Sequence, residues 1–429
     1  MPRRLALDVL DDILIRKKSL DDAFAEARRL NDLAPRDRGL ARRLVSETLR
    51  RLGQLDDIID RLLERPLPRK VRPVRQVLRL GLSQLLFLDT PAHAAVDTSV
   101  ELAAARGMFA HKALVNAILR RGAREGSDLV ARQDAAVLNT PAWLRERWAA
   151  AYGEAVCREI CLAHLNEPPL DVTAKTDPEG VAEALGGELL PGGTVRLRSA
   201  GPVSDLPGYG DGAWWVQDAA AALPVRLLDP EPGMHVADLC AAPGGKTAQL
   251  AAAGARVTAI DRSEKRLGTV RANLGRLGLN AEVICADATD WRPAEPVDAV
   301  LVDAPCSSTG TIRRHPELPW IKTETQMEGA AAIQRRLLDH ALHIVRPGGR
   351  VVFATCSLEP AEGRDIVSAV LGEAGGPRVH PVRTAVPGAT EQMITGDGML
   401  RTLPCHLADV GGMDGFFAAR IERVPTNDR

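Results

Sequence analysis

The sequence predicts a multidomain chain in which an N-terminal all-α bundle and a small α/β connecting subdomain precede a larger α/β domain with a mostly parallel sheet. Three observations predict this architecture. Apolar residues recur at helical spacing through residues 1–125, with no strand-like alternation. Short strand and turn patterns appear within residues 126–215, and strands alternate with helices across residues 216–429. A chain of 429 residues has room for two or three such domains.

Composition narrows the class of protein further. No run of about 18 apolar residues occurs, so we expect no membrane span. Acidic residues come too early in the N-terminal segment for a signal peptide, and we therefore expect a cytoplasmic protein. The seven cysteines are spread out without a C-x-x-C pair, which argues against a disulfide framework and against a zinc site. We expect no bound metal and a monomeric chain.

Residues 1–125 carry 25 Lys+Arg against 17 Asp+Glu, a net charge of +8, whereas the rest of the chain has a net charge of −9. This asymmetry indicates either a basic module that meets a polyanion or a hydrated, arginine-rich helical surface. A basic run near a helix junction allows the same two interpretations: Arg61, Arg65, Arg69, Lys70, Arg72, Arg75 and Arg79.

An ordered set of segments in this region resembles the NusB-like RNA-binding domain. The segments are R-L-A-L-D-V-L at 4–10, D-R-G-L-A-R-R-L-V-S-E-T-L-R-R at 37–51, L-R-L-G-L-S-Q-L-L-F-L at 78–88, A-A-V-D-T-S-V-E-L-A at 94–103 and K-A-L-V-N-A-I-L-R-R at 112–121. The resemblance implies that the all-α bundle binds RNA.

The middle of the chain predicts structure more clearly than function. We expect a connector from Gly122 to about Pro141, helices over 143–165, and short strands near 170–176 and 192–198. Cys157 and Cys161 lie four residues apart on one helical face, a spacing that suits two core residues better than a metal site. Trp214 and Trp215 are likewise expected in the core.

From residue 216 onward, apolar strand and helix patterns alternate. The expected strands are His235–Asp238, Val257–Asp261, Ala281–Cys285, Ala299–Asp303, Arg350–Ala354 and Gly415–Arg420. The expected helices are Ala219–Leu228, Lys246–Ala253, Lys265–Leu277, Gly329–Ile344 and Glu362–Leu371. Ligands of such sheets bind beyond the carboxyl ends of the strands. Asp238, Asp261, Asp287 and Asp303 fall at or just past these ends, and we expect the last three to be functional.

The loop that follows the first of these strands reads D-L-C-A-A-P-G-G-K-T. A phosphate-binding P-loop needs a glycine where Cys240 stands, and the dinucleotide pattern G-x-G-x-x-G is absent. The remaining interpretations are an S-adenosylmethionine (SAM) site and a glycine-rich turn without a ligand. The residues of the candidate SAM loop are Cys240, Ala241, Ala242, Pro243, Gly244, Gly245 and Lys246.

Two cysteines follow later strands of the same predicted sheet, Cys306 in V-D-A-P-C-S-S-T-G and Cys356 in A-T-C-S. One methylation requires a thiol, because C5 of a pyrimidine is too weak a nucleophile until a thiolate adds at C6. An acid that hydrogen-bonds N3 stabilises the developing charge, and Asp303 is the candidate. The chemistry alone leaves open which cysteine is the nucleophile.

The motifs D-L-C-A-A-P-G-G-K, V-D-A-P-C-S-S-T-G and A-T-C-S together resemble the RNA cytosine-5 methyltransferases, and with the NusB-like segment the chain resembles the RsmB (Sun) family. The resemblance implies a Rossmann-like SAM-dependent methyltransferase domain that acts on one cytosine of small-subunit (16S) ribosomal RNA. It implies that Cys356 is the nucleophile and that Cys306 helps to release the product. It also implies that the loop Cys240–Lys246 and Asp261, Asp287 and Asp303 contact SAM.

The segment R-R-H-P-E-L-P-W at 313–320 matches the same family and suggests a loop near the RNA, with His315 either functional or structural. Two alternatives remain open: a cytosine-5 methyltransferase for transfer RNA or another ribosomal position, and a non-catalytic RNA-binding or antitermination factor. A thiolate reaches C6 only when the target base has left its stack. The aromatic share of 3% argues against an extended stacking platform, so RNA affinity should depend steeply on salt.

Overall fold

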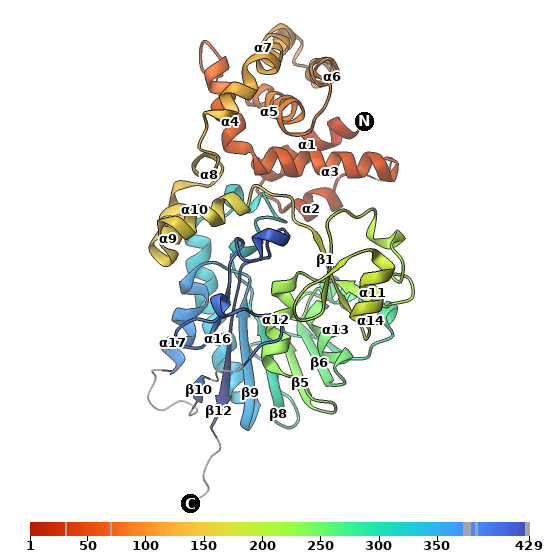
Figure 1. The fold of residues 1–429 in the computed structure, drawn as a ribbon, viewed down its shortest axis with the longest axis vertical. Coiled ribbons are helices and arrows are strands. Elements are labelled where there is room, and N and C mark those ends of the chain that lie inside the picture. Colours follow the sequence, from red (N-terminus) through yellow and green to blue (C-terminus); the bar gives the residue numbers. More distant parts are fainter. Residues whose placement is uncertain (31, 69–70, 372–378, 382–384, 425–429) are drawn as a thin grey trace, which may run out of the picture. The chain divides into compact units, whose positions relative to one another are not determined.

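The computed structural model of the chain describes residues 1–30, 32–68, 71–371, 379–381 and 385–424 (Figure 1). Contacts divide the chain into two units. The first consists of Met1–Asn166 with Ile312–Lys322, and the second of Glu167–Thr311 with Thr323–Arg429. The short segment Ile312–Lys322 therefore leaves the second unit in sequence and packs within the first.

The described part of the first unit is helical throughout, which confirms the predicted all-α bundle. Its helices are α1 (Pro2–Leu14), α2 (Leu20–Ala25), α3 (Pro35–Arg50), α4 (Leu52–Leu62), α5 (Arg72–Phe87), α6 (Ala92–Ala105), α7 (Lys112–Ala131), α8 (Ala135–Leu138), α9 (Ala142–Tyr152), α10 (Glu154–Ala163) and α15 (Leu318–Ile321). Leucine, isoleucine and valine side chains at the predicted helical spacing form its core, among them Leu5, Leu10, Leu44 and Ile58.

The connector predicted from Gly122 is wrong over its first ten residues, because α7 continues to Ala131. Gly122 and Gly126 are buried in this helix, and a Cβ at either position would lie within 2.6 Å of a leucine of α5, Leu82 or Leu86. These glycines therefore allow α5 and α7 to pack closely. In this helix they mark a close approach between helices and not a helix end.

The segment Ile312–Lys322 is held in the first unit by hydrogen bonds. Arg50 donates to the carbonyl oxygen of Arg313 at 2.9 Å, and the indole of Trp320 donates to that of Leu49 at 2.9 Å. Arg313 and Glu317 are each 1% exposed. The 313–320 motif thus contributes buried side chains to the bundle, in contrast to an exposed loop.

Part of the basic run is neutralised by acids of α4. Arg75 pairs with Asp56 and Asp60, and Arg79 donates to both carboxylate oxygens of Asp56 at 2.8 and 2.5 Å. The side chains of Arg65 and Arg72 are exposed, and Arg69 and Lys70 lie outside the described residues. Of the paired and exposed arginines named here, only the exposed Arg65 and Arg72 are candidates for a hydrated surface or for contact with RNA.

The second unit begins with a small α/β subdomain, as predicted. Its sheet has the order β2-β3-β1-β4, with α11 (Pro178–Leu185) packed beside it. The strands are β1 (Leu170–Ala174), β2 (Glu188–Leu189), β3 (Thr194–Leu197) and β4 (Trp214–Val216). Trp214 and Trp215 are 1% and 4% exposed, which confirms their expected place in the core.

The larger sheet of this unit has the order β10-β12-β9-β8-β5-β6-β7, with β11 paired to β12. Strands β5 to β9 are parallel, whereas β10, β11 and β12 are antiparallel additions. The predicted mostly parallel sheet is confirmed. Its strands are β5 (His235–Leu239), β6 (Arg256–Asp261), β7 (Glu282–Cys285), β8 (Val297–Asp303), β9 (Val345–Thr355), β10 (Val379–Pro381), β11 (Leu400–Thr402) and β12 (Phe416–Arg423).

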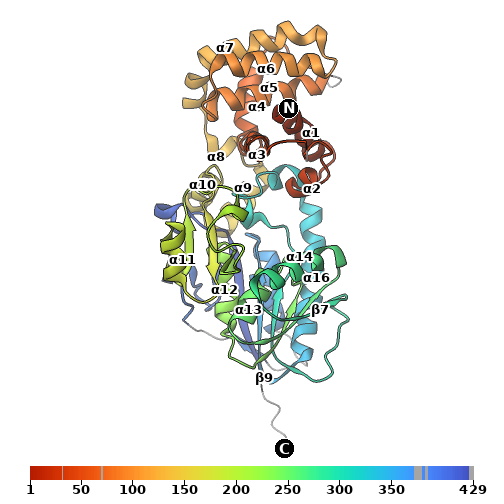
Figure 2. The same ribbon diagram turned by 90° about the vertical axis from the view of Figure 1, so that its right-hand side faces the viewer.

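Helices cover both faces of this sheet (Figures 1 and 2). One face packs against α12 (Ala219–Leu228) and α13 (Gly245–Ala252), and the other against α16 (Glu324–Ile344) and α17 (Arg364–Leu371). Leu267, Val270 and Leu274 of α14 (Glu264–Leu277) form a smaller cluster with Ala242. Because both faces are buried, the central strands are almost continuously apolar, as in Val297–Asp303.

The order of the parallel strands reverses at β5, which lies between β6 and β8. In open sheets of this kind, the crevice beyond the carboxyl ends at such a reversal is the usual ligand site. The predicted SAM loop follows β5 directly, Asp261 ends β6, and Asp303 ends β8. Among the described residues, no helix is both long and apolar enough to cross a membrane.

Candidate active site

The loop Cys240–Gly244 turns sharply between β5 and α13. Cys240 and Gly244 have positive φ angles of 65° and 99°. A Cβ at Gly244 would lie 3.2 Å from Val270 Cγ1, so both the backbone conformation and the space favour glycine. The amide of Ala241 donates to the carbonyl oxygen of Ile260 at 3.0 Å, which fastens the loop to β6.

Cys240 is a thiol in this environment. Burial, followed by the nearby Asp303 carboxylate, raises the pKa of Cys240 to about 12. A group with this pKa is protonated at neutral pH. Cys240 therefore offers the loop a small side chain and not a thiolate.

Asp238, two residues before the loop, is fully buried inside β5. Its Oδ2 accepts a 2.6 Å hydrogen bond from the Thr247 hydroxyl, whereas Oδ1 has no hydrogen-bond partner among the described residues. Burial raises the pKa of Asp238 to about 7. An unpartnered buried oxygen is costly, and a ligand donor that reached it would be stabilised.

Asp261 and Asp287 were both predicted to contact the cofactor, and their settings differ. Asp261 is 2% exposed, and its carboxylate accepts from the amides of Ala242 at 3.3 Å and Ser263 at 2.9 Å. It therefore joins the end of β6 to the loop. Asp287 is exposed and accepts from the amide and hydroxyl of Thr289 at 2.8 and 2.7 Å, which lowers its pKa.

Lys246, the last residue of the predicted loop, pairs with Asp303 across the sheet end. Its Nζ lies 2.8 Å from Asp303 Oδ2 and 4.9 Å from the centre of the Phe416 ring. Lys246 is 9% exposed, whereas Asp303 is partly exposed. The two predicted functions, cofactor binding and base recognition, thus meet in one ion pair.

The two predicted catalytic cysteines are neighbours. Cys306 follows β8, Cys356 follows β9, and their Sγ atoms lie 3.4 Å apart, although 50 residues separate them in sequence. Asp303 pairs with Ala354 in the β8–β9 ladder, so the two loops start side by side. The hydroxyl of Ser308 lies 3.4 Å from Cys356 Sγ. Both thiols are partly exposed.

The environment separates the acidities of these two thiols. The hydrogen bond from Cys306, aided by the Ser308 hydroxyl and the positive charge of Lys246, lowers the pKa of Cys356. The same hydrogen bond, then burial and the charges of Cys356 and Glu362, raise the pKa of Cys306. Cys356 is therefore the better thiolate of the pair, with Cys306 as its hydrogen-bond donor.

Sequence reasoning missed a buried carboxylate behind the thiols. Glu362, in the 3-10 turn Pro360–Glu362 before α17, is 1% exposed. It accepts hydrogen bonds from Ser307 and Ser357, the residues that follow the two cysteines. The sequence offered one hint: each of the two cysteines is followed by a serine, Ser307 or Ser357, and two serines in matching positions can bind the same group. Nothing in the sequence showed that this group is Glu362.

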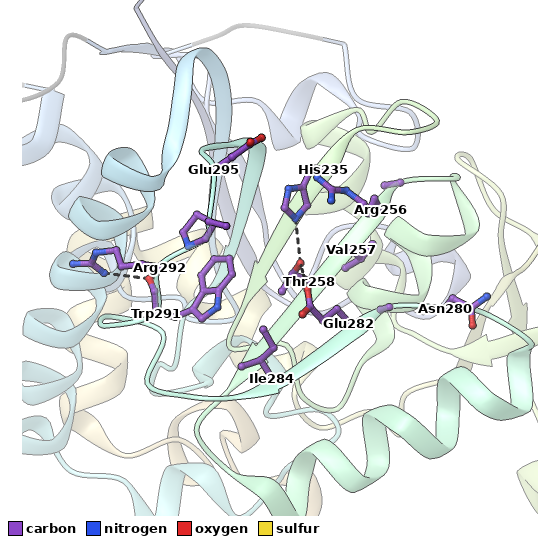
Figure 3. A pocket seen from close by; sticks show the side chains of 14 residues that line it. His235, Arg256, Val257, Thr258, Asn280, Glu282, Ile284, Trp291, Arg292 and Glu295 are labelled. Atoms are coloured by element: carbon purple, nitrogen blue, oxygen red, sulfur yellow. Dashed lines mark hydrogen bonds between the residues drawn. The ribbon is translucent and has the colours of Figure 1, made fainter.

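A cavity of about 750 Å³ lies elsewhere in the same unit (Figure 3). His235, Arg256 and Glu282 line it at the amino-terminal ends of β5, β6 and β7, the ends opposite to the SAM loop. Trp291–Glu295, in the segment that connects β7 to β8 without a helix, also line it. Neither cysteine and none of the predicted site residues line it, so this cavity is separate from the candidate active site.

The residues present fit SAM as the bound group. Gly244 has a left-handed backbone conformation and no side chain, so a ligand can approach the backbone of the loop closely at this residue. Oδ1 of the buried Asp238 has no hydrogen-bond partner among the described residues and could accept a hydrogen bond from the ligand. The end of β6 adds the buried Asp261 carboxylate, of the type that binds a ribose diol. Within the described ranges, no cluster of His, Cys, Asp and Glu could hold a metal ion.

Comparisons with known proteins show the family of the chain. A family described as 16S rRNA methyltransferase RsmB/F matches residues 225–422, and the NusB family matches residues 1–124. The probable ribosomal RNA small subunit methyltransferase B of Synechocystis is 34% identical over 98% of this chain and 99% of the relative. The ribosomal RNA small subunit methyltransferase B of Pseudomonas putida is 36% identical over 99% of this chain and 98% of the relative.

A solved structure is similar over about two thirds of the chain. A methyltransferase homolog protein from Pyrococcus horikoshii is 27% identical, with a TM-score of 0.54 over 65% of this chain and 94% of that one. The family resemblance predicted from the sequence motifs is confirmed, and with it the NusB-like and Rossmann-like parts of the fold. The chain belongs to the RsmB/F family of 16S rRNA methyltransferases, and SAM is its cofactor.

Proposed function

We propose that this methyltransferase transfers a methyl group from SAM to C5 of one cytosine in small-subunit ribosomal RNA, through a covalent bond between Cys356 Sγ and C6 of the base. The observation that carries the proposal is the thiol pair at the ends of β8 and β9, with Sγ atoms 3.4 Å apart. Most base methylations need no thiol at all. Two adjacent thiols beside a SAM loop suit the one chemistry that adds a thiolate to a pyrimidine and later removes it.

In the first step, the Cys356 thiolate adds to C6, and the electron pair of the C5–C6 double bond moves into the ring. For this step Asp303 must carry a proton, which it gives to N3 as the negative charge arrives there, and the carboxylate that remains is stabilised by the Lys246 ammonium group. The lowered pKa of Cys356, due first to the hydrogen bond from Cys306, increases the share of the thiolate that this step needs. SAM, when bound, supplies an electrophilic methyl group.

After C5 has taken the methyl group, a base in the site takes the C5 proton, N3 returns its proton to Asp303, and the bond between Sγ and C6 breaks. Elimination restores the C5–C6 double bond and returns the electron pair to Cys356 as a thiolate. Cys306 is the group next to Cys356, and we assign it to this release step. Its raised pKa, due first to the hydrogen bond with Cys356, makes it a proton carrier and a poor competing nucleophile.

The cofactor contacts are part of the same proposal. We assign them to the loop residues Cys240, Ala241, Ala242, Pro243, Gly244, Gly245 and Lys246, together with Asp261, Asp287 and Asp303. Lys246 links the two halves of the site, because its ammonium group pairs with the carboxylate proposed to recognise the base. The buried Asp261 is joined to the loop through Ala242, which supports its role most directly among the acids.

The N-terminal bundle is proposed to bind the RNA, in line with its net charge of +8 over residues 1–125. We propose that residues 1–125 form this RNA-binding domain, that residues 126–215 connect it, and that residues 216–429 carry methyl transfer. The target cytosine must be unstacked, so a single-stranded loop or an opened helix is the expected substrate. The relatives are named for small-subunit ribosomal RNA, which favours that RNA over others.

Bisulfite sequencing of ribosomal and transfer RNA from a deletion strain tests the substrate. The proposal predicts that one small-subunit cytosine loses its methyl group and regains it when the wild-type gene is restored, but not when Cys356→Ser is supplied. Loss at a transfer RNA position, with every small-subunit cytosine still methylated, would instead support the alternative substrate. The methyltransferase family match argues against a non-catalytic RNA-binding factor.

A further inference from the structure

The two loops that carry the thiols share one buried anion. Ser307, the residue after Cys306, donates its backbone N–H to Glu362 Oε1 at 2.9 Å, and its hydroxyl donates to Glu362 Oε2. Ser357, the residue after Cys356, donates its hydroxyl to the same Oε2 at 2.5 Å. The two serine hydroxyls lie 3.0 Å apart. A single carboxylate therefore binds both loops one residue beyond the sulfur atoms.

Other contacts hold Glu362 and the loops in one network. Gln334 of α16 donates to Glu362 Oε1 at 3.4 Å and to the carbonyl oxygen of Pro305 at 2.8 Å. The hydroxyl of Thr309 accepts from the amide of Leu358 at 2.9 Å. Ser307, Ser357 and Glu362 are each at most 3% exposed. A buried hydrogen-bond network of this kind holds its side chains in one arrangement. Removal of one member leaves the others with unpaired buried polar atoms, which destabilises that arrangement.

We propose that Glu362 is a positioning residue, which ties the Cys306 loop to the Cys356 loop and keeps the shared proton on Cys306, so that Cys356 carries the thiolate. This inference rests on the proposed function, because it explains how the nucleophile is selected between two equivalent amino acids. Glu362 touches neither reacting sulfur in the contacts described above, and its effect passes through Ser307 and Ser357.

The electrostatics support the same direction. The negative charge of Glu362 contributes to the raised pKa of Cys306, after the hydrogen bond to Cys356, burial and the charge of Cys356. It is absent from the main influences on Cys356, whose pKa is lowered first by the Cys306 hydrogen bond. Glu362 thus acts unequally on the two thiols, as a group that selects between them must.

The test measures each thiol separately in the full-length protein without RNA. Iodoacetamide alkylation of Cys306 and Cys356 is followed against pH by peptide mass spectrometry, in wild type, Glu362→Gln and Asp365→Asn. Asp365 is an exposed acid three residues further along the chain and serves as the charge-matched control. In wild type, Cys356 should titrate at the lower pH. Glu362→Gln should raise the midpoint of Cys356 and lower that of Cys306, which narrows the gap by about one pH unit, whereas Asp365→Asn should leave it unchanged.

Steady-state methylation adds a second measurement. Glu362→Gln should lower kcat by about tenfold at neutral pH with little change in KM for SAM, and higher pH should restore part of the loss. Glu362→Asp, which keeps the charge, should retain the high midpoint of Cys306. If Glu362→Gln fails to fold, as judged by circular dichroism, Ser357→Ala replaces it, with the same direction and a smaller shift.

The outcomes separate this inference from the proposed function. An unchanged gap between the two midpoints in Glu362→Gln, or in Ser357→Ala if that variant is used, overturns the role of Glu362 and leaves the role of Cys356 intact. A lower midpoint for Cys306 than for Cys356 in wild type contradicts the assigned nucleophile, and this inference falls with it.

Discussion

Lys246 Nζ and Asp303 Oδ2 lie 2.8 Å apart, an ion pair between the end of the SAM loop and the end of β8. Lys246 is the second residue of α13, next to the proposed cofactor contacts, and Asp303 lies three residues before Cys306, next to the proposed base contacts. A cytosine that hydrogen-bonds Asp303 would therefore also lie near the positive charge of Lys246. Under the proposed function, this ion pair lies between the SAM site and the target cytosine.

Replacing Lys246 with glutamine should slow methyl transfer and move its pH profile upward. The pKa of Cys356 is lowered first by Cys306, and Lys246 adds to the lowering, so its loss leaves less thiolate at neutral pH. We expect a fall in kcat of about 10–100-fold at neutral pH that is smaller at high pH. Lys265→Gln removes an exposed lysine of α14 and is the matched control. An equal fall at every pH would contradict the role of Lys246 in thiol ionisation.

Gly244→Ala should weaken SAM binding and destabilise the protein. The φ angle of 99° disfavours any residue with a Cβ, and the added atom would press on Val270 at 3.2 Å. The expected loss is about 1–2 kcal/mol of unfolding free energy, with a higher Kd for SAM by titration calorimetry. Gly268→Ala in α14, where a Cβ meets nothing within 4 Å, should instead leave Kd unchanged and stabilise slightly. Equal effects of the two substitutions would argue against a strained loop at Gly244.

Asp238→Asn should flatten the dependence of stability on pH. Burial raises the pKa of Asp238 to about 7, well above its unfolded value near 3.9. Between about pH 4 and about pH 7 the folded protein keeps a proton that the unfolded chain has released, so its unfolding free energy falls as pH rises through this window. Asparagine cannot ionise, and the fall of a few kcal/mol should shrink.

Denaturant unfolding at a series of pH values measures this difference, with Asp290→Asn as an exposed control. The wild-type and Asp238→Asn curves should diverge toward neutral pH, where the variant becomes relatively more stable. Parallel curves for the two proteins would show that Asp238 stays ionised in the fold.

The arginines of the basic run should fall into two groups, one that stabilises the helical bundle and one that binds RNA. Arg75 and Arg79 are paired with acids, whereas Arg65 and Arg72 are exposed. Arg65→Ala with Arg72→Ala should weaken RNA binding and reduce the slope of log affinity against log salt by about 0.7 for each phosphate that is no longer neutralised. Arg75→Ala with Arg79→Ala should lower the unfolding temperature and leave that slope unchanged. Filter binding across a salt series, with thermal unfolding beside it, separates the two pairs.

The sequence predicted the fold closely where the apolar pattern was compatible with only one type of secondary structure. The alternation after residue 216 predicted the bounds of β5, β6 and β8 to within one or two residues, because buried parallel strands are almost continuously apolar. It missed the first five residues of β9, which begins at Val345 and not at Arg350. Gly122 and Gly126 misled because a glycine that permits close helix packing has the same local sequence as one that ends a helix. The short strands β10 and β11 were missed, since three residues carry no measurable period.

For the candidate site, the sequence singled out the residues that we propose to react, but not their arrangement. The strand-end positions of Asp303, Cys306 and Cys356 implied proximity, and the structure adds a distance of 3.4 Å between the thiols. The ion pair of Lys246 with Asp303 spans 57 residues and has no local pattern. In the sequence, Glu362 looks like any other acidic residue near the start of a helix. Only the structure shows that it accepts hydrogen bonds from both cysteine loops.

Trapping of the adduct tests most directly whether Cys356 forms the bond to C6 of the base. The protein is incubated with SAM and small-subunit RNA containing 5-fluorocytidine, whose C5 fluorine cannot leave as a proton does, and the cross-linked peptide is identified by mass spectrometry. We expect an adduct on Cys356 in wild type, and one that still forms in Cys306→Ser. Cys356→Ser should form no adduct and should methylate at least about 1,000-fold more slowly. An adduct on Cys306, which persists in Cys356→Ser, would contradict the assignment of Cys356 as the nucleophile.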